Sequence, residues 1–161
     1  MDFRAYRTIG ECTTQFEREI VRDVETTGHA LVRGLLLEGN FVDVQTVGLE
    51  HSFEHPELAV LGLPPATAEG LLEGLVSMIQ RGRRFHAGQV CSDLPIRVPQ
   101  LRFEQIARRE YEEHLSTACW FYGSTEFRAL QVVWPDWNLR FPDDPLFAES
   151  LACQQPYLGA P

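Results

Sequence analysis

The chain has 161 residues, of which 44% are hydrophobic and 23% are charged, with fourteen basic and twenty-three acidic side chains. The net charge of −9 leaves no basic surface for a phosphate backbone, so nucleic acid is not an expected partner. No apolar run reaches the roughly 18 residues of a membrane span, and no signal peptide opens the chain. We therefore expect one cytoplasmic globular domain that does not enter a membrane.

All fourteen basic residues are arginine. Without lysine, the chain cannot anchor pyridoxal phosphate or form the lysine-containing phosphate loop of nucleotide-binding proteins. The four cysteines are scattered singly, which argues against a zinc ribbon or a redox pair and favours reduced thiols. The sequence thus predicts no cofactor, although it leaves a metal ion open.

The N-terminal part predicts a helix. We expect residues 1–12 to be a poorly ordered lead-in and residues 13–161 to form the single domain. Thr14 and Glu17 are spaced as a capping box, in which each side chain satisfies a free amide group of the other residue. Apolar residues then recur at every fourth position until Gly28, a residue type that commonly ends helices.

Strand patterns dominate the next part of the chain. Residues 30–37 and 41–49 are rich in branched apolar side chains and are separated by turn-forming residues, which predicts an antiparallel pair. Residues 58–63 have the pattern of a buried strand that two prolines terminate. A leucine-rich pattern over residues 66–80 then predicts a second helix.

The last elements complete the predicted fold class. Apolar side chains at helical spacing predict a third helix over residues 108–122, and residues 127–134 form the clearest late strand. From about residue 135 the chain is rich in proline and is expected to be a loop-like tail. Since a hairpin joins the first two strands, we predict an α+β fold with a mostly antiparallel sheet and about three packed helices.

The densest polar cluster runs from Glu50 to Glu57, between two predicted strands. Its two imidazoles and three carboxylates are groups that bind metals and transfer protons. His51 and His55 align only on a helix, whereas Pro56 favours extended backbone at His55. If a metal is bound here, His51, His55 and Glu57 are its ligands, and His55 and Glu57 are the catalytic candidates. The alternative, which we favour, is a structured loop in which His55 and Glu57 bond backbone groups.

Residues 134–138, which begin with the Trp-Pro-Asp turn (residues 134–136), are the second notable segment, because they place two tryptophans and a carboxylate at a strand end. Such groups suit a ligand pocket or a partner surface. Alternatively, Trp134 completes the core and Asp136 caps the turn. We expect this turn to border a pocket shared with the His-Pro-Glu segment (residues 55–57). That arrangement requires the strand at 58–63 to run antiparallel to the strand at 127–134.

Taken together, these segments resemble a bacterial family of domains of unknown function, family forty-two sixty-two. The resemblance covers about residues 26–158 and rests on His55-Pro56-Glu57-Leu58, on Arg128-Ala129-Leu130-Gln131-Val132-Val133-Trp134-Pro135-Asp136 and on the leucine-rich helix between them. It implies no activity, but it marks His55, Glu57, Trp134 and Asp136 as motif positions.

Two functions follow from these observations. The first is a module that binds a small molecule or a protein partner. The second is a small, metal-assisted enzyme that uses His51, His55 and Glu57. We favour the binding module, because the sequence contains no recognised catalytic constellation. The candidate binding residues are Thr46, His51, His55, Glu57, Trp134 and Asp136.

Overall fold

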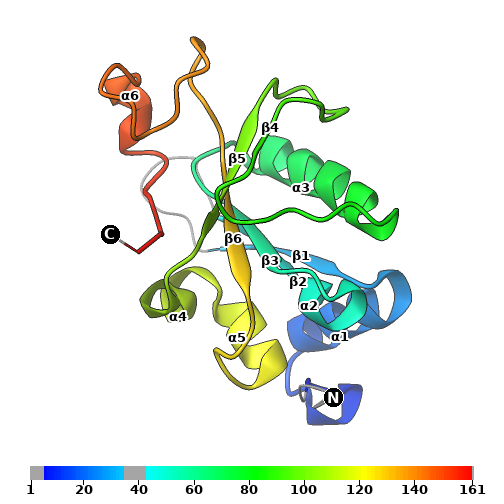
Figure 1. The fold of residues 1–161 in the computed structure, drawn as a ribbon. Helices are drawn as coiled ribbons and strands as arrows, with labels where there is room; N and C mark the ends of the chain where they lie inside the picture. Colours follow the sequence, from blue (N-terminus) through cyan, green and yellow to red (C-terminus); the bar gives the residue numbers. More distant parts are fainter. Residues whose placement is uncertain (1–5, 35–42, 161) are drawn as a thin grey trace.

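A computed structural model describes residues 6–34 and 43–160 of the chain. Its centre is a six-stranded sheet with the order β1-β2-β3-β6-β5-β4 (Figure 1). The strands are β1 Ala30–Arg33, β2 Val44–Val47, β3 Glu57–Val60, β4 Val90–Cys91, β5 Leu101–Gln105 and β6 Ala129–Val133. The α-helices in these ranges are α1 Gln15–Thr27, α2 Leu49–Phe53, α3 Pro65–Gln80, α4 Tyr111–His114, α5 Ser116–Tyr122 and α6 Glu149–Ala152, and two 3-10 turns span Ile9–Glu11 and Arg108–Glu110.

The α+β prediction is confirmed, whereas the predicted number of helices is wrong: the described ranges contain six rather than about three. Helix α1 forms as expected, because Thr14 accepts a hydrogen bond from the Glu17 amide and Gly28 closes the helix in a left-handed conformation. The expected helix over 108–122 is divided, since Leu115 leaves helical geometry at φ −131° and ψ 30°. The other two additional helices are α2, inside the polar cluster, and α6, inside the expected tail.

Strand directions determine where the two sequence motifs lie. Strands β1 and β2 pair antiparallel, as do β2 and β3, β5 and β6, and β4 and β5. Strands β3 and β6 are parallel, with Glu57 opposite Ala129 and Ala59 opposite Gln131. The sheet is thus mixed at its centre, where one parallel pair interrupts the antiparallel pattern.

The core has two layers, one on each face of the sheet. Helix α3 covers one face, and α1, α4 and α5 cover the other (Figure 1). Along β3, Leu58 and Val60 pack with the α3 layer, while Ala59 packs with the opposite layer. This alternation follows from the two-residue period of a strand and explains why all four residues of β3 are buried.

The terminal segments also contact this core. Within residues 6–12, the amide of Arg7 donates to the carbonyl of Phe121 on α5 at 2.7 Å. Near the other end, the tail returns to β6, where the Leu158 amide donates to the buried side chain of Gln131. Residues 1–5 of the expected lead-in, and residues 35–37 and 41–42 of the expected strands, lie outside the described residues.

All four cysteines are free thiols. No helix in the described part of the chain is long and apolar enough to cross a membrane.

Candidate functional site

The His-Pro-Glu segment is buried inside the protein. Glu57 begins β3, and its side chain is 0% exposed. One carboxylate oxygen accepts from the Thr46 hydroxyl at 2.6 Å. The other accepts from the Tyr122 hydroxyl at 2.5 Å and from the amides of Gly48 and Glu50 at 3.0 and 3.2 Å. Four donors therefore converge on one buried carboxyl group.

Local backbone geometry makes this convergence possible. Gly48 precedes α2 with φ +103°, and a Cβ at this position would lie 2.8 Å from Val24. Only glycine fits this conformation and this close approach without strain. The turn directs the first amides of α2 toward Glu57, where a helix N-terminus favours negative charge.

Burial dominates the proton affinity of the Glu57 carboxyl group. Loss of solvent raises its pKa to about 7, and the hydrogen bonds from Thr46 and Tyr122 oppose that rise. Burial and the neighbouring carboxylate also raise the pKa of the Tyr122 phenol, so Tyr122 stays a hydrogen-bond donor. These partners in the chain engage both oxygens of the Glu57 carboxyl group.

His55 is likewise engaged on both sides of its ring. Nδ1 lies 2.7 Å from the carbonyl oxygen of Pro56, and Nε2 accepts from the amide of Phe85 at 3.1 Å. These partners fit a neutral imidazole with the proton on Nδ1. Burial lowers the pKa of His55 to about 4, which keeps the ring neutral. The geometry therefore matches the structured-loop alternative for His55 and Glu57.

His51 lies apart from these two residues. It belongs to α2 and is exposed, and its ring centroid lies 4.0 Å from that of Tyr6. Over residues 6–34 and 43–160, the side chains of His51, His55 and Glu57 do not bring three ligand atoms within reach of one metal ion. The metal set considered from the sequence is thus not assembled in this structure.

The predicted shared pocket is also wrong, for a topological reason. It required the strand after the His-Pro-Glu segment to run antiparallel to the strand before Trp134, but β3 and β6 are parallel. Trp134 lies five residues beyond Ala129, the partner of Glu57, which is about 16 Å along the strand at roughly 3.3 Å per residue. The two segments therefore lie at opposite ends of the sheet.

The Trp-Pro-Asp turn instead borders a cleft of its own, with a volume of about 510 Å³. The chain leaves β3 toward α3 on one face of the sheet, whereas the chain after β6 returns over the other face to Gln131. Loops that diverge from adjacent parallel strands leave a crevice at the carboxyl ends of those strands. The cleft is lined by Gly62, Leu63, Pro64, Arg97, Val98, Pro99, Trp134, Pro135, Asp136, Trp137, Leu139, Leu151 and Gln154.

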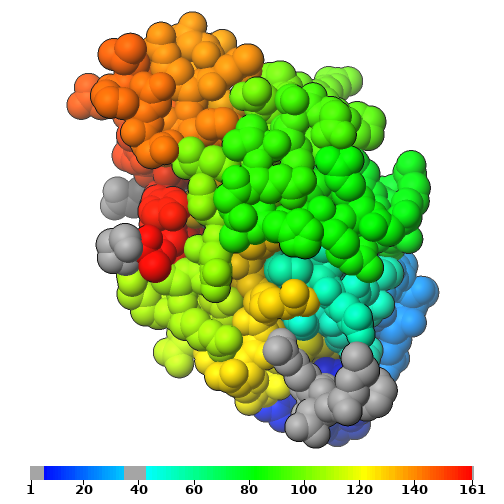
Figure 2. Space-filling model, viewed as in Figure 1, coloured from blue at the N-terminus to red at the C-terminus, as the bar shows by residue number. Residues whose placement is uncertain are grey.

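Two of these side chains are available to a ligand. Trp137 is 80% exposed, which is unusual for a large aromatic residue in the wall of a cleft. Arg97 is exposed, and in the described part of the chain its guanidinium has no hydrogen bond or ion pair. In Figure 2, the orange segment that includes the turn lies beside the green segment that precedes β5.

Hydrogen bonds hold the turn that presents Trp137. Asp136 is buried and accepts from the amides of Asn138, Arg140 and Ala148. Although burial acts against it, these amide donors lower the pKa of Asp136 and keep it ionised. Leu139 adopts φ +59°, a conformation that costs a non-glycine residue about 1 kcal/mol or more and often occurs at functional turns.

Hydrogen bonds of Trp134 fix the start of the turn. Its indole nitrogen donates to the Leu61 carbonyl at 2.8 Å, and its backbone exchanges two hydrogen bonds with the Gln155 side chain. Trp134 is only 6% exposed, so it forms the floor of the cleft. Trp134 and Asp136 were named as binding residues from the sequence, and Trp137 as the second aromatic of the segment, whereas Arg97 was missed. Trp137 is visible in the sequence as a second tryptophan beside the motif, whereas no sequence signal places Arg97 near Trp137.

The structure is thus a single α+β domain with a mixed sheet, a buried carboxyl–phenol network at one end and an aromatic-lined cleft at the other. Residues 40–148 match the model of a domain of unknown function, DUF4262. The chain belongs to this family. No curated protein and no solved structure matches the chain.

Proposed function

We propose that the protein is a binding module for a small planar aromatic carboxylate, which it holds in the cleft beside Trp137. The observation that carries this proposal is an exposed indole together with a guanidinium that has no partner among residues 6–34 and 43–160, both in the wall of one cleft. An aromatic ring stacks on the indole face, and a carboxylate forms charge-assisted hydrogen bonds with Arg97. The volume of about 510 Å³ suits a ligand of this size.

The remaining lining favours binding over catalysis. It is largely apolar and contains no histidine, cysteine, serine or lysine, so no nucleophile with an adjacent base lines the cleft. Asp136 also faces this region, but backbone amides engage both of its oxygens. Arg97 is thus the charged group that a ligand can pair with here. An anionic ligand therefore fits better than a cationic one.

The proposal is tested by calorimetric titration with 1-naphthoate and with its uncharged amide. We expect the acid to bind and the amide to bind at least about tenfold more weakly, since a charge-assisted hydrogen bond contributes about 1.5–3 kcal/mol. Arg97→Gln should weaken the acid to the level of the amide. Trp137→Ala should weaken both, by about 0.5–1.5 kcal/mol from lost stacking.

Arg22→Gln is the matched control, because the substitution removes the same charge. Arg22 is exposed on α1, a helix that contributes no residue to the lining of the cleft. This variant should bind like the wild type. The proposal would be overturned by equal affinity for the acid and the amide, or by unchanged binding in Trp137→Ala. It would also be overturned if about 10 mM acid gave no heat of binding, since that concentration detects even a weak Kd of about 1 mM.

A further inference from the structure

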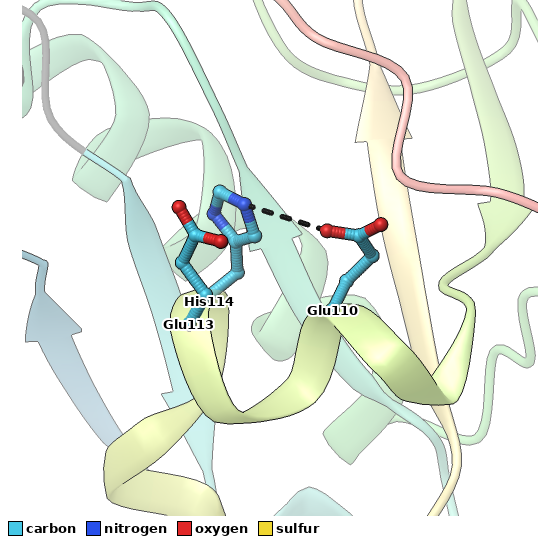
Figure 3. Close-up of side chains that lie close together, drawn as sticks. All are labelled: Glu110, Glu113 and His114. Carbon is cyan, nitrogen blue, oxygen red and sulfur yellow. Dashed lines mark ion pairs between the residues drawn. The ribbon is translucent and has the colours of Figure 1, made fainter.

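A second cluster of polar side chains lies away from the cleft, where the chain passes from the 3-10 turn at Arg108–Glu110 into α4 (Figure 3). Glu110, Glu113 and His114 are spaced i, i+3 and i+4, which places them on one side of a helical turn. Each contributes one ligand-type atom, and these atoms all lie within 4.8 Å of one another. No other group of this kind occurs among residues 6–34 and 43–160.

The His114 imidazole is fixed in a specific orientation. The residue is only 9% exposed, and Nδ1 lies 2.7 Å from a carboxylate oxygen of Asp43, the residue before β2. Nε2 faces Glu110, whose nearest oxygen is 3.9 Å away, and it makes no hydrogen bond within the described part of the chain. Nε2 of this largely buried side chain is therefore directed at the Glu110 carboxylate without a hydrogen bond among the described residues.

The charges around this nitrogen are mainly negative. Asp43, Glu110 and Glu113 supply three carboxylates, and Arg109 pairs with one of them, with its Nε 3.0 Å from the other oxygen of Glu110. The two carboxylates of Glu110 and Glu113 repel each other unless a cation lies between them. The cluster is thus electrostatically suited to a divalent ion.

We propose that Glu110, Glu113 and Nε2 of His114 bind one divalent first-row metal ion, of which Mn²⁺ is the representative. Carboxylate and imidazole ligands suit this class of ion. A metal-binding histidine characteristically donates its other ring N–H to a carboxylate, which is the contact that Asp43 makes. This inference is independent of the function proposed for the cleft.

The geometry requires only a small closure of the site. Metal–ligand bonds of about 2.1 Å place neighbouring ligand atoms roughly 3 to 3.5 Å apart, whereas the atoms here lie up to 4.8 Å apart, so the site must close by up to about 1.5 Å. Glu113 is exposed and Glu110 is half-buried, so both side chains can rotate toward the imidazole. Three protein ligands leave coordination positions open for water or for a small anionic molecule.

The test uses Mn²⁺ and the full chain after treatment with a chelator and dialysis. Titration followed by electron paramagnetic resonance measures the bound ion, and pulsed measurements detect a coordinated imidazole through its nitrogen nucleus. We expect one Mn²⁺ per chain with imidazole nitrogen coupling. Glu113→Gln should weaken binding at least tenfold, because it removes a ligand from an exposed position where folding is not at risk.

Glu112→Gln is the matched control, since Glu112 is exposed on the same helix and lies outside the cluster. It should bind Mn²⁺ within about threefold of the wild type, which separates ligation from a general loss of charge. His114→Gln should abolish the nitrogen coupling. Equal weakening in both glutamate variants, absence of nitrogen coupling, or no binding at millimolar Mn²⁺ would overturn the proposed site.

Discussion

Glu57→Gln should change how the stability of the protein depends on pH. The side chain is 0% exposed, and burial raises the pKa of its carboxyl group from 4.5 to about 7. Between these two values the folded protein holds a proton on Glu57 that the unfolded chain has lost. Stability from this group is therefore fully present below about pH 4.5 and is lost as the pH rises through about 7.

The size of the effect follows from the two pKa values. A difference of one unit corresponds to about 1.4 kcal/mol, and most of the interval between 4.5 and about 7 is crossed from pH 5 to pH 8. The free energy of unfolding of the wild type should thus fall by about 2 to 3 kcal/mol over this range because of Glu57 alone. Glutamine does not titrate, so the difference between variant and wild type should move in favour of the variant by the same amount.

Urea unfolding at pH 5 and pH 8 measures this difference, because titration of every other group cancels between the two proteins. Glu25→Gln is the control, since Glu25 is exposed on α1 and the substitution removes one carboxyl group from the surface. Its difference from the wild type should stay constant within about 0.5 kcal/mol. A constant difference for Glu57→Gln would refute the reasoning, and would mean that the four donors keep the carboxylate ionised across the whole range.

Two further substitutions test the same end of the sheet by urea unfolding. Tyr122→Phe removes the hydroxyl that donates to the buried carboxyl group at 2.5 Å and should lower the unfolding free energy by about 1.5–3 kcal/mol; a loss below about 0.5 kcal/mol would show that this hydrogen bond contributes little. His55→Ala leaves the buried amide of Phe85 without an acceptor and should cost about 1–3 kcal/mol. A His55 variant with full stability but impaired binding of 1-naphthoate would instead show that His55 acts in ligand recognition.

Local signals in the sequence were sufficient for several elements of the fold. The capping box at Thr14, the glycine stop at Gly28 and the leucine pattern of α3 each act within one helix, and the structure shows all three. The helix predicted over 108–122 is interrupted at Leu115. The spacing of the apolar residues does not reveal this break. That break depends on packing against the sheet, where Leu115 is completely buried.

Strand direction could not be obtained from the same signals. The run at 127–134 was correctly predicted as a strand, but its parallel pairing with β3 depends on residues about seventy positions away in the sequence. Because the strand direction was predicted incorrectly, the Trp-Pro-Asp turn was expected at the same end of the sheet as the His-Pro-Glu segment. Arg97 was missed for the same reason, since only the folded chain brings it to Trp137. The i, i+3 and i+4 spacing of Glu110, Glu113 and His114 is visible in the sequence.

The parallel pair β3 and β6 places the two motifs in different environments. A ligand that reached Glu57 would have to displace donors from four residues, and each buried donor left unpaired costs about 1–3 kcal/mol. No comparable cost applies at the opposite end, where Trp137 is already 80% exposed and the oxygens of Asp136 are occupied by the turn itself. This difference supports the proposed binding site at the carboxyl ends of the parallel strands, while the Glu57 carboxyl group and the His55 ring are already engaged within the chain.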